Sequence, residues 1–143
     1  MPWTYDPRTY NYRDEETGRF ISAQDVIEVS GLALDRTLPI ASQLANLLAT
    51  DRLTLRDWEI LMRQEIKSAY IQQYLLGRGG LNRMTQADWG SIGGMLTKQY
   101  RYLNRFSREI ARGTLTEGQI AARSQMYFNS ARQAFSRGRA RAM

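Results

Sequence analysis

Cysteine and histidine are both absent from this sequence of 143 residues, and each absence excludes a kind of chemistry. Without cysteine the chain has no disulfide and no thiolate metal ligand. Without histidine it lacks Ser-His-Asp and Cys-His nucleophiles, imidazole metal sites and the commonest general base. We therefore expect a protein that is not an enzyme and that has no metal site and no cofactor.

Long apolar runs are also missing. The most apolar stretch, IASQLANLLA at 40–49, has about half the length that a bilayer requires. The first ten residues show no basic segment followed by an apolar one, so we predict no signal peptide. With 43% apolar and 24% charged residues, the composition predicts one globular domain without a membrane partner.

The charge is unevenly distributed along the chain. Residues 1–97 carry 10 basic and 12 acidic groups, whereas residues 98–143 carry 10 basic and 2 acidic groups, which gives balances of −2 and +8. Eighteen of the 20 basic residues are arginine, whose guanidinium binds phosphates and carboxylates in bidentate fashion. The C-terminal third is therefore expected to contact an anionic partner.

Four fragments share one pattern, in which an apolar residue precedes Ser or Thr, and Asp or Gln follows that hydroxyl after three residues. They are FISAQDV (20–26), RLTLRDW (52–58), RMTQADW (83–89) and TLTEGQI (114–120). The spacing is typical of a capping box with a hydrophobic staple at a helix start. We predict N-caps at Ser22, Thr54, Thr85 and Thr116.

These starts predict an all-α fold, a bundle of four or five helices over residues 22–136. The first helix is expected to begin after Ser22 and to kink or break at Pro39, with Thr37 as a second cap. The remaining helices are expected over residues 55–76, 86–112 and 117–136.

The ends and faces of these helices follow from glycines and from apolar spacing. Gly77 is predicted to end one helix as a left-handed cap, and Gly113 is predicted to end the next helix. Trp58 and Trp89 are expected to point inward. The segment RGRARAM, at 137–143, has no apolar face and is predicted to fray as a basic tail.

Residues 1–21 show no helical periodicity and form a predicted N-terminal arm. The stretch YNYRDEETGRFIS (10–22) is typical of a short β-hairpin that turns around 16–18. The arm is rich in aromatic residues, namely Trp3, Tyr5, Tyr10, Tyr12 and Phe20. It either folds back on its own helices or docks on a neighbouring subunit, and both interpretations stay open.

The segment MTQADWGSIGG (84–94) raises the question of a phosphate loop beside a catalytic Asp88. The glycines Gly90, Gly93 and Gly94 fall inside a predicted helix rather than before it, which excludes a P-loop. Each glycine costs a helix about 1 kcal/mol relative to alanine. We expect another backbone to pass close to them, either from this chain or from a partner.

A row of cations follows on the same helix. Its members are spaced 3, 4, 3 and 4 residues apart and therefore share one face: Lys98, Arg101, Arg105, Arg108 and Arg112. The tail adds Arg137, Arg139 and Arg141. Three interpretations stay open for the row, which are a solvated face, a surface for an acidic protein, and a surface for phosphates.

Four phrases of the sequence resemble small proteins of tailed bacteriophages and prophages that accompany the virion structural module. They are YRDEETGRFIS, MRQEIKSAYIQQYLLGRGG, MTQADWGSIGGMLTKQYRYLNRF and LTEGQIAARSQMYFNSAR, and they cover most of residues 12–135. The resemblance implies a virion or assembly component near the head or neck. It carries no catalytic residues.

From this we expect a structural protein of a tailed-phage virion that docks on capsid, portal or connector subunits. It is expected to form a homo-oligomer within the particle and to contact packaged DNA without sequence preference. The alternative is a stand-alone nucleic-acid-binding helical protein that uses its arginine-rich C-terminal third.

Overall fold

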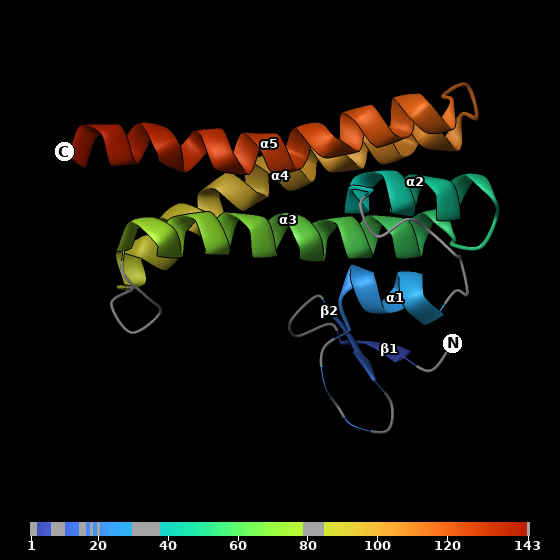
Figure 1. Ribbon diagram of the computed structural model, residues 1–143, viewed down its shortest axis with the longest axis horizontal. Coiled ribbons are helices and arrows are strands. Elements are labelled where there is room, and N and C mark those ends of the chain that lie inside the picture. Colours follow the sequence, from blue (N-terminus) through green and yellow to red (C-terminus); the bar gives the residue numbers. More distant parts are fainter. Residues whose placement is uncertain are drawn as a thin grey trace.

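The computed structural model describes most of the chain as a bundle of helices with a small N-terminal hairpin (Figure 1). The described residues are 3–6, 11–14, 17, 19, 21–29, 38–78 and 85–142. Their elements are β1 (Trp3–Asp6), β2 (Asn11–Asp14), α1 (Ala23–Val29), α2 (Ile40–Ala49), α3 (Leu55–Arg78), α4 (Gln86–Ala111) and α5 (Glu117–Ala142). The predicted all-α class, with four to five helices and an N-terminal arm, is confirmed.

All four predicted N-caps are present. Each hydroxyl accepts a hydrogen bond from the backbone N–H three residues later: Ser22 from Asp25 at 3.2 Å, Thr54 from Asp57 at 3.1 Å, Thr85 from Asp88 at 3.2 Å and Thr116 from Gln119 at 3.2 Å. Three side chains return the bond to the cap's own N–H: Asp25 at 2.8 Å, Asp88 at 2.8 Å and Gln119 at 2.9 Å. The capping boxes therefore set where α1, α4 and α5 begin.

Helix α3 is the centre of the fold. Figure 1 shows α5 along one side of α3 and the hairpin on the other, while α4 crosses α3 obliquely. Helix α2 contacts α5, α1 and α3. Trp58 of α3 is fully buried, and its ring meets Phe106 of α4 edge-on, with ring centroids 5.7 Å apart. Tyr127 of α5 stacks on Phe106 at 6.4 Å. The aromatic core thus joins the three long helices where they cross.

The expected break near Pro39 is confirmed, because α1 and α2 are separate helices. Pro39 itself is the N-cap of α2, with φ −58°, and it makes no side-chain cap hydrogen bond. The carbonyl of Pro39 accepts from the N–H groups of Ser42 and Gln43 at 3.0 and 3.1 Å. The second cap that we predicted, Thr37, lies outside the described residues.

The hairpin exists, but its predicted position was wrong. Trp3 pairs with Asp14, and Tyr5 pairs with Tyr12, so the chain reverses between Asp6 and Asn11 rather than around 16–18. The sequence reason is the Asp6–Pro7 step, because an Asp-Pro dipeptide favours the start of a turn.

Two predicted helix ends also need correction. Gly77 lies inside α3, which extends to Arg78, and a shift of this size is ordinary at a helix end. Helix α5 continues to Ala142, through most of the segment 137–143 that we expected to fray. Arginine and alanine are both strong helix formers, so the helix can continue without an apolar face.

Candidate functional site

The most distinctive surface of the molecule is the outward side of α4, and we call it the α4 outer face. It comprises Gly90, Gly94, Lys98, Arg101, Arg105, Arg108 and Arg112. Every one of these residues is exposed. The helix rotates about 100° per residue, so they form one line opposite the buried side chains of Ile92, Leu96 and Leu103.

Most cations of this face have no polar partner among the described residues. No hydrogen bond or ion pair joins the side chains of Lys98, Arg101, Arg105 and Arg108 to another described residue. Like charges at spacings of three and four residues repel one another, by about 0.2–0.5 kcal/mol per pair. The row therefore destabilises the isolated helix, although its position near the helix C-terminus offsets part of the repulsion.

The carboxylate nearest to the row, Glu109, is already occupied. Its Oε2 accepts from Nη1 of Arg123 on α5 at 2.5 Å. This hydrogen bond, helped by the charges of Arg123 and Arg112, lowers the pKa of Glu109 below its ordinary value. Arg123 also lies over the Phe106 ring at 4.5 Å. Glu109 therefore joins α4 to α5, and of the row only Arg112 contributes to the lowering of its pKa.

The glycines of α4 are not explained by packing within the chain. Gly90, Gly93 and Gly94 are all exposed, and a Cβ built on any of them would meet nothing within 4 Å. The expectation that a backbone of this chain passes close to them is wrong for the described residues. The alternative, that the backbone of a partner protein passes close to these glycines, stays a prediction.

Trp89 was predicted to point inward, and this is also wrong, because its side chain is 43% exposed. The described contacts of α5 with α4 involve Phe106 and Glu109, in the second half of α4. The first turn of α4 rests on α3 instead, where Asp88 takes the inward position. Met95 and Tyr102 are likewise exposed, at 36% and 43%, so they border the outer face with apolar surface.

Asp88 has two roles in the fold, of which only the capping box was predicted from the sequence. Its Oδ2 accepts from the N–H of Thr85 at 2.8 Å, as the capping box predicts. Its Oδ1 accepts from the hydroxyl of Tyr74, near the end of α3. The side chain is buried and both of its oxygens are used, so it joins two helices.

A polar network between α3 and α4 was missed by the sequence reasoning. Arg63 donates to Glu59 at 3.1 Å and to Asn104 at 2.6 Å. The hydroxyl of Ser107 donates to the other oxygen of Glu59 at 3.1 Å. Tyr100 lies beside the Arg63 guanidinium, and burial raises the pKa of its hydroxyl to about 12. The i, i+4 spacing of Glu59 and Arg63 was the one visible signal.

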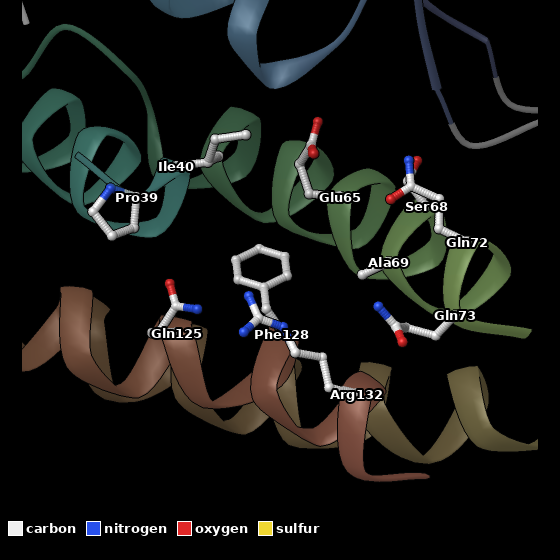
Figure 2. A pocket seen from close by; sticks show the side chains of 10 residues that line it. All are labelled: Pro39, Ile40, Glu65, Ser68, Ala69, Gln72, Gln73, Gln125, Phe128 and Arg132. Carbon is white, nitrogen blue, oxygen red and sulfur yellow. The ribbon is translucent and has the colours of Figure 1, made fainter. Parts of the chain in front are cut away.

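A cleft of about 340 Å³ lies between the start of α2, the middle of α3 and α5. Figure 2 shows Phe128 and Gln125 of α5 pointing towards α3 across it, whereas Glu65 points away from α5. Glu65 accepts from the N–H of Ala23 at 3.0 Å, and burial raises the pKa of its carboxyl. The described residues hold no group of His, Cys, Asp or Glu that could bind a metal ion. The ionisable side chains that line the cleft are Glu65 and Arg132.

The residues predicted in the arm lie apart from the α4 outer face. Trp3, Tyr5 and Tyr12 belong to the hairpin, whose strand β2 lies near α3 (Figure 1). Tyr10 and Phe20 lie outside the described residues. The backbone of the hairpin therefore folds back towards its own bundle, one of the two interpretations that the sequence left open.

The arginines of the tail lie on a different helix from the row. Helix α5 begins after α4 ends and runs back along the bundle (Figure 1). The backbone positions of Arg137, Arg139 and Arg141 lie about 30–36 Å along α5 from its first residue, Glu117.

Fold and surface together define a small all-α helical bundle with an exposed basic helix face. Within the described residues, no helix has the length and apolar character needed to cross a membrane. Comparison with protein-family models, curated proteins and solved structures gives no match to this chain.

Proposed function

We propose that the chain is a non-enzymatic structural protein of a tailed-phage virion, which docks on subunits of the head or head–tail connector. The observation that carries this proposal is the α4 outer face, where an exposed line of cations continues into glycines that no part of the described chain covers. Both features cost the isolated helix stability, and contact with a partner would offset that cost. The assignment to a tailed-phage virion rests on the resemblance of residues 12–135 to proteins of the virion structural module.

The proposal is tested in a phage that encodes this chain. Purified particles should contain the protein at a fixed copy number by mass spectrometry. Deleting its gene should yield heads or tails that fail to join or to mature, as seen by electron microscopy. Particles that lack the protein, together with normal assembly in the deletion, would contradict it.

The second candidate is a protein that binds nucleic acid on its own, and the unpaired arginines of α4 favour it. If the five cations of the row all contact phosphates, the logarithm of the affinity for duplex DNA falls with the logarithm of salt, with a slope of about −4 to −5. A slope near zero, or no binding at physiological salt, removes this candidate.

A further inference from the structure

We propose that the partner of the α4 outer face is an acidic α-helix of another protein, with carboxylates on one side at spacings of three and four residues. The inference rests on the proposed docking role and adds the chemistry of the partner. Three properties of the face carry it, which are the spacing of the cations, the position of the glycines and the nature of the side chains that border the row.

The spacing of the cations is that of a coiled-coil seam. Positions that alternate at three and four residues remain on one line when two helices wrap around each other with a left-handed supercoil. Lys98 and Arg112 delimit a row of this kind, which is about 21 Å long. A second helix with carboxylates at the same spacing would bring an acid opposite each cation.

The glycines extend the same line towards the start of α4. Gly90 and Gly94 precede Lys98 at intervals of four residues, and Gly93 lies beside them. The space where their side chains would be is open. Small residues at a helix crossing allow two backbones to approach closely, and a Cβ at these positions would hold a partner away. A close helix crossing gives these three glycines a reason that the isolated chain does not supply.

Double-stranded DNA fits the face less well. A helix meets the curved phosphate backbone over a short arc, whereas this row extends over about 21 Å of helix, from Lys98 to Arg112. The glycine end of the line carries no cation for a phosphate. Two exposed side chains that border the row, Met95 and Tyr102, add apolar surface of the kind that helix–helix contacts bury.

A second copy of this chain does not supply the acidic helix within the described residues. Asp25 and Glu28 are exposed and three residues apart, but α1 has 7 residues and is too short to cover the row. The carboxylates of α3, which are Asp57, Glu59 and Glu65, are not fully exposed. The complementary helix is therefore assigned to another protein.

The test uses the full chain and two synthetic helical peptides of about 22 residues with identical composition. The seam peptide carries five glutamates at spacings of 3, 4, 3 and 4. The permuted peptide distributes the same glutamates around the helix, so its net charge is equal. Titration at physiological salt should show at least about tenfold tighter binding of the seam peptide. Equal affinities, no binding of either peptide, or displacement of the seam peptide by duplex DNA at lower concentration would overturn the inference.

Matched variants place the binding on the face. Arg101→Gln with Arg105→Gln removes two cations from the row, and each lost pair should weaken binding of the seam peptide about 1.5- to 5-fold. The control, Arg52→Gln with Arg56→Gln, removes two exposed cations that are not on α4, and should leave the affinity unchanged. Loss of affinity in the control equal to that in the row variant would show that net charge alone attracts the peptide, against the inference.

A third variant tests the glycines. Gly94→Leu places a bulky side chain in open space, so the chain should fold as before by circular dichroism, while affinity for the seam peptide falls about tenfold or more. Unchanged affinity would overturn the close crossing.

The experiments can refute the virion assignment and the acidic partner helix independently of each other. Particles that contain the chain, combined with equal affinity for both peptides, refute the acidic helix alone. Preference for the seam peptide, combined with particles that lack the chain, supports the acidic helix and refutes the virion assignment.

Discussion

The hydroxyl of Tyr74 donates a hydrogen bond to Oδ1 of Asp88, and this bond joins the end of α3 to the first turn of α4. The same carboxylate caps its own helix through Thr85. Asp88 therefore helps to fix the direction in which α4 leaves α3, together with the packing of Trp58 on Phe106 further along the two helices. That direction decides which side of α4 faces solvent.

Replacing Asp88 should destabilise the protein. Asp88→Ala removes the returned bond of the capping box and leaves the Tyr74 hydroxyl without this acceptor, with an expected loss of about 1–3 kcal/mol in the free energy of unfolding. Urea denaturation followed by circular dichroism measures the change. Tyr74→Phe keeps the cap and removes one hydrogen bond, so it should cost less, about 0.5–1.5 kcal/mol. An equal or larger loss in Tyr74→Phe would contradict the dual role of Asp88.

Alanine at the exposed glycines of α4 should stabilise the free protein. The added Cβ of Gly90→Ala, Gly93→Ala or Gly94→Ala meets nothing within 4 Å. Alanine lowers the entropy lost on folding, so each change should add about 0.5–1 kcal/mol to the free energy of unfolding. Thermal melts measure the gain.

Gly113 is the matched control for these three substitutions. It also has open space around it, but its φ is +75°, in the left-handed region that side chains disfavour. Gly113→Ala should therefore lower stability by about 1–2 kcal/mol. A gain of stability at Gly113, or a loss at all three glycines of α4, would contradict this account of the backbone.

The carboxyl of Glu65 should make stability depend on pH. Burial raises its pKa above the ordinary value of 4.5, and the charge of Asp25 adds to the rise. The folded state then binds more protons than the unfolded state, so the stabilising contribution is complete below about pH 4.5 and is lost as pH rises through the folded pKa.

Glu65→Gln removes this titration and keeps an oxygen that can accept from Ala23. The variant should be more stable than the wild type at pH 7, and the difference should shrink towards pH 4. Denaturation at a series of pH values measures it. A difference that stays constant across the series would mean that the carboxyl has the same pKa in the folded and unfolded states.

Much of the fold was predictable because its signals are local. A capping box needs residues three apart, so Ser22, Thr54, Thr85 and Thr116 were identified from the sequence alone. The row of cations was equally predictable, since its members lie on one helix.

The errors arose where distant segments decide the outcome. Trp89 has the apolar spacing of a core residue, but Asp88 takes the buried position beside α3 and Trp89 is exposed. The bond from Tyr74 to Asp88 and the network around Arg63 each join two helices. No spacing within one helix predicts such pairs. The occupant of the α4 outer face belongs to the same class of question, because the partner is a separate chain.

The row of cations should itself limit the stability of the free protein. Arg105 has a like charge four residues before it and another three residues after it, each repelling by about 0.2–0.5 kcal/mol. Arg105→Gln should therefore raise the free energy of unfolding by about 0.4–1 kcal/mol at low salt, and by less at 0.5 M salt, where screening acts within about 4–5 Å. Denaturation at both salt concentrations measures the two values. The control is Arg56→Gln, on α3 and outside the row, which should show little dependence on salt. Stabilisation by Arg105→Gln that is equal at both salt concentrations would mean that helix propensity, rather than repulsion within the row, is responsible. A salt-dependent gain would show that the free chain keeps a repulsive surface, which an acidic partner helix would neutralise.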